Sequence, residues 1–298
     1  MTMVRGAFSK LLAPGYRKIV FETYKERAME GDKLVNKNTS KRAYEEDFPI
    51  AGFGTLQKKV EGGPFTYQDA MQGDAKRYTW STYALGFRIT QEMMEDDLYG
   101  IMGNRMSKAL GRSGRNNAEI VMHSPFNNAF DTAYPGFVAG EALCGSHVAL
   151  RGATQSNVPA AAADFDILSL QAALEHFHQL EDESEIPAVF IPRKVIHSVG
   201  DHWTEASVLK SQYLPGSNQN DINQVSNEGL TPHLSHYLDD VDAWFVQCGE
   251  HDVNYWERRA FTFGNSDDFE TGDAKFKATR RNGAGWGDWR GIYGSTGV

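Results

Sequence analysis

The feature that most constrains the fold is a strand-forming stretch, residues 45–88, with too few apolar side chains to build its own core. Turn signals divide it into short β-prone pieces, at Gly52, Gly54, Gly62-Gly63-Pro64 and Gly73-Asp74. An isolated two-stranded ribbon is marginally stable in water. The sequence therefore predicts a long hairpin that must lie on something else, such as another copy of the chain.

Residues 90–122 predict one long helix. Thr90 is a good N-cap, acidic residues fill the first turns, and Lys108, Arg112 and Arg115 gather near the far end, where they complement the helix dipole. Glycines interrupt this pattern at positions 100, 103, 111 and 114. Because glycine weakens a helix, we expect a bend or break near Gly111 to Gly114, and we expect Pro125 to end the helix.

The remainder of the chain mixes helices with strands. Asp164 is expected to cap a helix that ends at the acidic run 181–183, and residues 194–209 predict a further helix. Short apolar runs at 188–191 and 243–248 predict buried strands, and 259–263 and 275–280 predict strands near the end of the chain. These elements do not follow βαβ order, so the predicted fold class is α+β.

Charge is distributed unevenly along the 298 residues, which carry a net charge of −9. Residues 1–42 hold 10 Lys and Arg against 4 Asp and Glu, whereas residues 126–250 hold 4 against 17. Unless the asymmetry is incidental, it predicts a basic arm that contacts neighbouring subunits or a polyanion, and an acidic, well-hydrated middle. The polar run 36–42 favours an extended arm rather than a core element.

Composition excludes several classes of protein. The sequence is 41% hydrophobic and 23% charged, as in ordinary folded soluble proteins. It has no run of about 18 apolar residues, so no membrane span is predicted. Cys144 and Cys248 are too few for a disulfide framework, and we expect reduced thiols in a cytosol.

No set of residues argues for catalysis. Glycine-rich phosphate loops are missing from the sequence, and the acidic residues between Asp267 and Asp273 do not follow the order of a calcium loop. His233 and His236 are spaced to share a helix face, and His147 follows Cys144 closely. These residues leave a metal-dependent or hydrolytic enzyme open as an alternative. We predict no enzyme, no cofactor and no metal.

Four segments resemble the Mu-like major head subunits of tailed bacteriophages. They are GFRITQEMMEDD at 86–97, IPRK at 191–194, YLDDVDAWF at 237–245 and KFKATRRNGAGWGDWRGIYG at 275–294. The likeness extends over about three quarters of the chain and is weakest in the arm. The resemblance implies the Hong Kong 97 capsid fold.

That fold assigns each part of the chain a place. The resemblance implies an N-terminal arm at 1–44, an extended β-hairpin or E-loop at 45–88, the spine helix of a peripheral domain at 89–125, an axial domain at 126–248, and peripheral-domain strands at 249–298. Inter-subunit contacts are expected from the arm and the hairpin, at Arg17, Lys18, Lys58, Lys59, Phe65, Tyr67, Tyr78 and Trp80.

The implied function is that of a major capsid protein. It would self-assemble as hexamers and pentamers into an icosahedral head around double-stranded DNA, in the virion, after assembly in the host bacterial cytoplasm. Its expected partners are copies of itself, a portal, a candidate decoration protein and DNA bound without sequence preference, but no membrane. The sequence leaves no room for a scaffolding segment before the arm, so a separate scaffold protein is expected. The alternative is an encapsulin-like nanocompartment shell around a cargo enzyme.

Overall fold

The computed structural model describes residues 9–96, 100–134, 140–151, 154–214, 221–268 and 270–298. Its internal contacts divide the chain into two units. Unit 1 comprises residues 1–45, 79–122 and 255–284, and unit 2 comprises residues 46–78, 123–254 and 285–298. Both units mix helices with strands, which confirms the α+β class.

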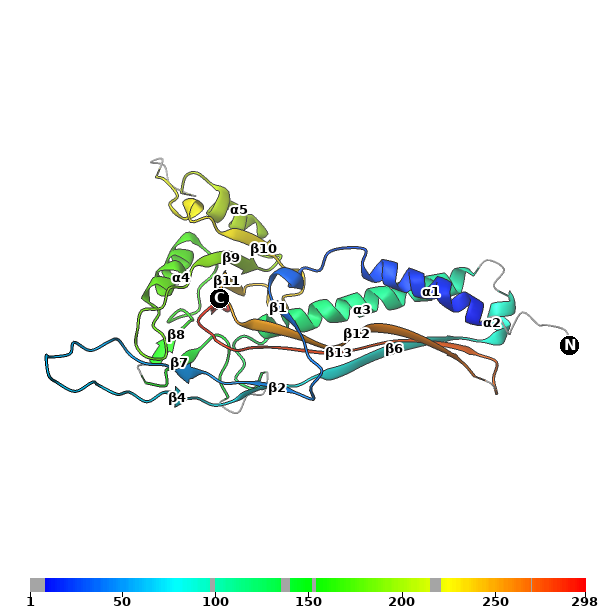
Figure 1. Cartoon of the computed structure of the whole chain (residues 1–298). Coiled ribbons are helices and arrows are strands. Elements are labelled where there is room, and N and C mark those ends of the chain that lie inside the picture. Colours follow the sequence, from blue (N-terminus) through cyan, green and yellow to red (C-terminus); the bar gives the residue numbers. More distant parts are fainter. Residues whose placement is uncertain (1–8, 97–99, 135–139, 152–153, 215–220, 269) are drawn as a thin grey trace. The chain divides into compact units, whose positions relative to one another are not determined.

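Unit 1 is built on a four-stranded sheet in the order β1–β12–β13–β6 (Figure 1). The strands are β1 (Asn36–Thr39), β6 (Ser81–Ile89), β12 (Val253–Asp267) and β13 (Ala274–Trp286). The strands expected at 259–263 and 275–280 are confirmed within β12 and β13. On β13, Phe276 and Ala278 are buried while Lys275 and Lys277 are exposed, so the period-two alternation separates two faces.

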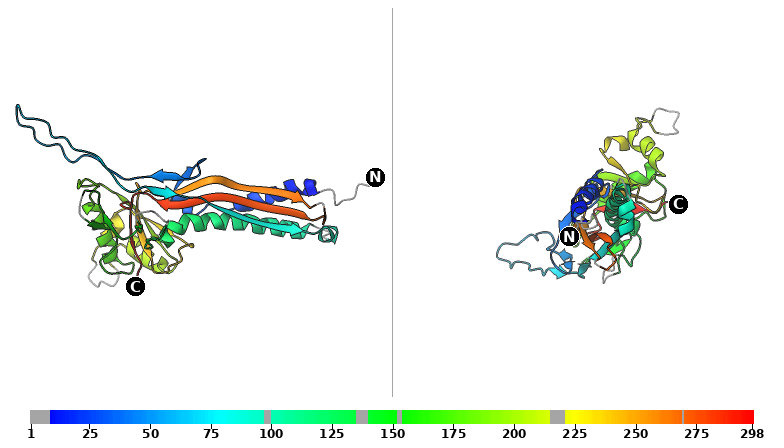
Figure 2. Two further views of the ribbon diagram at one scale, coloured as in Figure 1. Left: turned by 90° about the horizontal axis from the view of Figure 1, so that it is seen from below. Right: turned by 90° about the vertical axis from the view of Figure 1, so that its right-hand side faces the viewer.

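Two helices, α1 (Ser9–Tyr24) and α3 (Ile101–Asn127), cover one face of this sheet (Figure 2). Val20 of α1 and Leu110 of α3 pack with Phe261 and Ala278 of the sheet. Tyr16 of α1 meets Phe276 edge to face, with 5.3 Å between ring centroids. In the described part of unit 1, no helix covers the opposite face of the sheet.

The long helix breaks at a different glycine from the one expected. The break lies at Gly100, whose φ of +63° suits glycine, between α2 (Gln91–Asp96) and α3. Helix α3 runs unbroken through Gly111 and Gly114, and Pro125 lies in its last turn instead of ending it. A Cβ at Gly111 would lie 2.6 Å from the carbonyl oxygen of Val20. These glycines therefore let α1 and the sheet approach α3 closely.

Residues 36–42 are extended and only Ser40 among them is buried, as expected of a segment outside the core, but they pair with the edge of the unit 1 sheet. Asn36–Thr39 form edge strand β1, and the next residue, Ser40, donates its N–H to the Glu257 carbonyl at 3.2 Å. Upstream, the fully buried Glu119 carboxylate accepts the backbone N–H groups of Glu30 and Gly31, both at 2.9 Å. These long-range bonds hold a polar segment against unit 1. Residues 1–8 of the predicted arm lie outside the described residues.

Unit 2 contains a second four-stranded sheet, in the order β10–β9–β11–β14. Its strands are β9 (Pro192–His197), β10 (Thr231–Leu234), β11 (Trp244–Cys248) and β14 (Ile292–Ser295). The buried strand expected at 243–248 is confirmed as β11, all of whose residues are buried. The prediction grouped all of residues 249–298 with the peripheral-domain strands. Because β14 pairs with β11, residues 285–298 instead belong to unit 2.

The predicted boundaries of the strand and the helix between residues 188 and 209 are wrong. Residues 188–191 form no strand, and Val189 is 80% exposed. The strand is β9, because Val195 and Ile196 are buried where it pairs with β11. It replaces the first part of the expected helix 194–209, so α5 begins only at His202 and ends at Lys210. Pairing with a distant strand decided between helix and strand here.

Helix α4 (Ile167–Gln179) is capped by Asp166 and not by Asp164. The Asp166 carboxylate accepts the Ser169 N–H at 2.6 Å, and the Ser169 hydroxyl accepts the Asp166 N–H at 2.9 Å, which forms a capping box. Asp164 instead accepts the N–H of Val298 at 2.7 Å.

The remaining elements of unit 2 are short. Strand β2 (Glu45–Asp47) pairs with β5 (Lys76–Tyr78), β3 (Ile50–Ala51) with β4 (Met71–Gln72), and β7 (Ser146–Val148) with β8 (Thr154–Ser156). One-turn 3₁₀ helices lie at Gly31–Lys33 in unit 1 and at Val225–Asn227 in unit 2. Among the described helices, none has the length and apolar character needed to cross a membrane.

Asp201 stands at the start of α5, and one of its carboxylate oxygens is buried without a hydrogen-bond partner among the described residues. Burial, together with the nearby carboxylates of Asp242 and Asp164, raises the pKa of Asp201 to about 6. Its ionisation therefore opposes folding at neutral pH.

The substitution Asp201→Asn tests this. Because the folded-state pKa lies above the unfolded value of about 4, the cost of ionisation appears as the pH rises through 6 and is absent below 4. We expect the free energy of unfolding of the variant to exceed that of the unaltered chain by about 1 kcal/mol at pH 8, a value that is reduced for solvent screening. At pH 4 we expect no difference. Urea denaturation of the unassembled chain measures both. An equal gain at the two pH values would contradict the account.

A pair of glycine substitutions tests the close contact of α1 with α3. Gly111→Ala should destabilise the unassembled chain by about 1–3 kcal/mol, because the new methyl group meets the Val20 carbonyl. The control is Gly15→Ala in α1, where a Cβ has nothing within 4 Å. There we expect a gain of about 0.5–1 kcal/mol from helix propensity. Two gains of similar size in urea denaturation would contradict the packing.

Candidate assembly surfaces

The hairpin is the segment from Phe48 to Gln72 of unit 2, and it ends in a tight turn (Figures 1 and 2). At its base, β3 pairs with β4, and the Gly73 N–H donates to the Pro49 carbonyl at 2.9 Å. Midway, the Gly54 N–H donates to the Gln68 side-chain oxygen at 2.8 Å. The tip turn is closed by Gly63 N–H donating to the Val60 carbonyl at 3.0 Å, and Gly62 supplies its positive φ of +76°.

Large apolar side chains are exposed along the whole hairpin. Tyr67 is 89% exposed and Leu56 is fully exposed. The set is Phe48, Ile50, Phe53, Leu56, Val60, Phe65, Tyr67 and Met71. Scattered exposed apolar residues are ordinary, but a contiguous set of this size marks an interaction surface.

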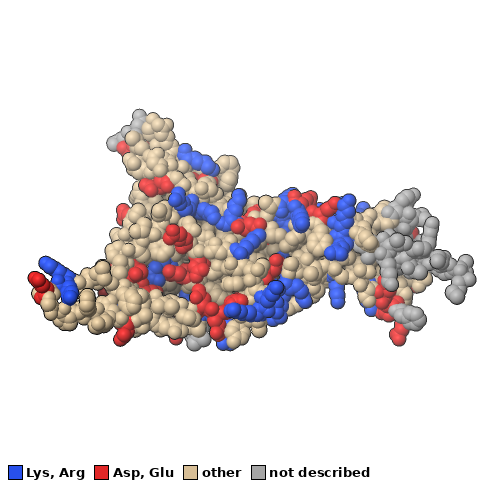
Figure 3. Space-filling model, in the orientation of Figure 1, with Lys and Arg blue, Asp and Glu red and all other residues tan. Residues whose placement is uncertain are grey.

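Four of the residues predicted to contact other subunits lie together near the hairpin tip. Lys58, Lys59, Phe65 and Tyr67 are all exposed, and the Lys59 ammonium lies 4.3 Å from the centre of the Phe65 ring. Figure 3 shows the charged tip beside uncharged surface. Arg17 and Lys18 are also exposed, but they lie on α1 of unit 1.

The structure corrects the prediction for Tyr78 and Trp80, which are buried within their own chain at 4% and 7% exposure. The Trp80 indole N–H donates to the Arg42 carbonyl at 3.1 Å. Burial raises the pKa of the Tyr78 hydroxyl. Burial alternates along residues 76–80, and it places these two aromatic side chains on the inward side. They are therefore left out of the proposed contact set.

The open face of the unit 1 sheet carries small side chains. Phe87 and Phe276 are register partners on the helix-covered side, so their neighbours along each strand point the other way. On this open face, small residues line the two strands that flank β13: Thr82, Ala84 and Gly86 on β6, and Ala260, Thr262 and Gly264 on β12. The long side chains of Lys275 and Lys277 stand between these rows on β13, so an extended backbone can lie close to the sheet only over β6 or β12.

Lys76 anchors the base of the hairpin. It is 8% exposed, its ammonium lies 3.8 Å from the centre of the Trp286 ring, and it donates to the Gly287 carbonyl. Burial lowers the pKa of Lys76, against the raising effect of Glu141, Asp288 and Asp252. A pocket of about 440 Å³ opens beside it, lined by several carboxylates. Lys76 was not among the residues predicted from the sequence. The one feature that pointed to it is its place directly before a strand rich in aromatic residues.

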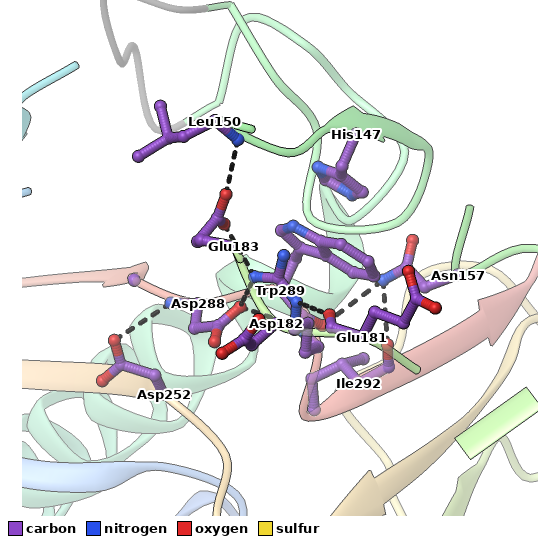
Figure 4. A network of polar contacts seen from close by, with 12 residues as sticks. His147, Leu150, Asn157, Glu181, Asp182, Glu183, Asp252, Asp288, Trp289 and Ile292 are labelled. Carbon is purple, nitrogen blue, oxygen red and sulfur yellow. Dashed lines mark hydrogen bonds and ion pairs between the residues drawn. The ribbon is translucent and has the colours of Figure 1, made fainter. Parts of the chain in front are cut away.

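Arg290 is the centre of a second buried polar network in unit 2. Figure 4 labels the residues that surround it, among them Glu181, Glu183 and Asp288. Its guanidinium donates to the Glu181 carbonyl at 2.8 Å, the Glu183 carboxylate at 2.8 Å and the Asp288 carboxylate at 3.2 Å. Glu183 also accepts the Leu150 N–H at 2.7 Å. The network joins the acidic run 181–183 to the turn near the end of the chain.

Asn157 fastens the same region. It is fully buried, donates to the carbonyls of Leu143 at 2.9 Å and Ile292 at 2.8 Å, and accepts the Gly145 N–H at 2.8 Å. Beside it, His147 stacks on Trp289 with 4.3 Å between ring centroids. Several chain segments therefore converge on a rigid base below the hairpin.

The alternative chemistries find no support in this geometry. His233 lies in strand β10, so the helical spacing with His236 does not apply. Cys144 and Cys248 are buried free thiols, and burial raises the pKa of Cys248 to about 12. Within the described residues, no three His, Cys, Asp or Glu side chains gather as metal ligands would.

A family model described as phage capsid protein matches residues 73–295. The chain belongs to this family. Solved structures with a similar fold include chains of Mycobacterium phage Che8 (TM-score 0.57, 11% identity, 90% of this chain and 92% of that chain) and Mycobacterium phage Patience (0.57, 9%, 98% and 88%). A third is from the mature capsid of bacteriophage PhiM1 (0.56, 10%, 87% and 84%). No curated protein matches the sequence.

The capsid protein therefore has the Hong Kong 97 fold that the resemblance implied, and it is a major capsid protein of an icosahedral shell in the virion. Its family is structural, and the phage match disfavours the encapsulin-like alternative.

The substitution Arg290→Met tests whether the network of Figure 4 stabilises the hairpin base. It leaves Glu183 and Asp288 without their cation, so we expect a loss of about 3 kcal/mol in the free energy of unfolding, measured by urea denaturation. The control Lys275→Met breaks an ion pair with half-exposed Lys275 and should cost less than about 1 kcal/mol. Equal losses in the two variants would contradict the structural role.

Proposed function

We propose that the capsid protein assembles by laying the hairpin of one copy along the open sheet face of the next, repeating this contact within hexamers and pentamers. Two features of the chain support this. The hairpin exposes apolar side chains that it cannot bury by itself, and the β6 and β12 rows of the sheet face offer small side chains that admit an extended segment. An extended segment lying between subunits meets both conditions.

Apolar burial supplies the driving force of this contact. Each large hairpin side chain that moves from water into the contact contributes about 1.5–3 kcal/mol. Fixing the loosely bonded hairpin costs conformational entropy, which opposes this gain. A single contact is therefore weak, and the closed shell gains stability from repetition.

The shell is proposed to enclose double-stranded DNA and to assemble in the host bacterial cytoplasm with a separate scaffold protein, a portal and a decoration protein. This part of the proposal rests on the resemblance to tailed-bacteriophage head subunits and on membership of a phage capsid family. Six exposed residues are proposed to contact a neighbouring copy: Arg17 and Lys18 on α1, and Lys58, Lys59, Phe65 and Tyr67 on the hairpin.

The substitution Ala84→Trp tests the proposed contact. Ala84 is exposed in the middle of the open sheet face, so an indole there should block the hairpin of the next copy without disturbing the core. We expect sedimentation and electron microscopy to show unassembled protein with an unchanged circular dichroism spectrum. The control is Ala109→Trp, which adds the same side chain to the exposed side of α3 and should leave shells intact. Normal shells from Ala84→Trp would overturn the proposal.

A further inference from the structure

The outward side of α3 carries a row of basic side chains. Arg105, Lys108 and Arg112 are all exposed and are spaced by three and four residues, so they share one side of the helix. At 1.5 Å per residue, the row spans about 10 Å along the helix axis.

Nothing in the described structure neutralises this row. From Ile101 to Ala118 the helix contains no Asp or Glu, and the next acid, Glu119, is fully buried against Glu30 and Gly31. Among the described residues, the three cations form no ion pair. Four other exposed cations of unit 1 are paired: Lys18 with Glu22, Lys37 with Asp32, Arg42 with Glu45 and Lys275 with Asp268.

The position of the row within unit 1 is defined by packing. The inner side of α3 packs on the helix-covered face of the sheet, through Leu110 and the close contact of Gly114 with Phe261. The row therefore lies on the side of unit 1 opposite the open sheet face (Figure 2). If hairpins of neighbouring copies occupy the open face, the row is on the other surface of the shell wall.

We infer that this outward side of α3 faces the lumen and binds the phosphate backbone of packaged double-stranded DNA without sequence preference. The inference rests on the proposed function. A row of unpaired cations complements a continuous polyanion, and each phosphate contact releases counterions. Side chains that contact only the phosphates of DNA do not distinguish one base sequence from another.

Charge complementarity favours DNA over the acidic unit 2 of another copy. Unit 2 holds 9 Lys and Arg against 24 Asp and Glu, but many of these carboxylates are already engaged. Glu183 and Asp288 bind Arg290, and Asp166 and Asp182 accept backbone N–H groups. Unit 1 holds 21 Lys and Arg against 15 Asp and Glu, so it attracts DNA where unit 2 repels it.

The test measures binding of the full-length, unassembled chain to a fluorescent 20-base-pair duplex at salt concentrations from about 50 to 200 mM, the range over which phosphate contacts are sensed. The variant combines Arg105→Gln, Lys108→Gln and Arg112→Gln, since glutamine keeps helix propensity. The control combines Lys37→Gln, Arg42→Gln and Lys275→Gln, which removes equal charge from paired positions of the same unit.

We expect the slope of log affinity against log salt to fall by about 2.7 in the α3 variant, which is three phosphate contacts at 0.9 each, and to change much less in the control. Equal slopes in the two variants would overturn the inference. So would failure of the α3 variant to form shells, because the row would then be a contact between copies. If the unaltered chain forms no shells, the proposed function fails, while the comparison of slopes still decides whether α3 binds DNA.

Discussion

The rest of the structure depends on the exposed apolar surface of the hairpin, which has no core of its own in which to bury it. Between Phe53 and Tyr67 the hairpin holds itself with few hydrogen bonds and exposes its largest side chains. A monomer gains nothing from such a segment, since it orders backbone without burying side chains. The segment becomes favourable when a second copy covers it, so the unit of stability is the assembly.

A contact of this kind requires rigid surfaces on both sides. At the hairpin base, the buried cations Lys76 and Arg290 and the amide of Asn157 join distant chain segments through carbonyls and carboxylates. In unit 1, glycines on α3 let α1 and the sheet approach closely. Both devices trade local helix or side-chain freedom for fixed geometry, which a repeated shell contact needs.

Sequence patterns predicted what local chemistry determines. The hairpin followed from its turn glycines. The cap and charge gradient predicted one helix, but Thr90 and the acidic residue Glu92 belong to the start of the short α2, and α3 has no acidic residue in its first turn and no basic residue in its last. Strands β11, β12 and β13 followed from apolar runs and alternation. Patterns failed where a distant partner decides. Asn36–Thr39 form a strand because they pair with β12, and Gly111 leaves space for the backbone of Val20. No local pattern shows either contact. Tyr78 and Trp80 needed knowledge of which side of the strand faces inward.

The measurement that tests the central claim most directly is a cryo-electron microscopy reconstruction of the assembled shell at side-chain resolution. The account predicts that hairpin residues 53–67 of one copy lie across Ala84 and Thr262 of the adjacent copy, with Leu56 and Tyr67 covered. A hairpin that folds back on its own chain, or that projects into solvent with the sheet face bare, would contradict it.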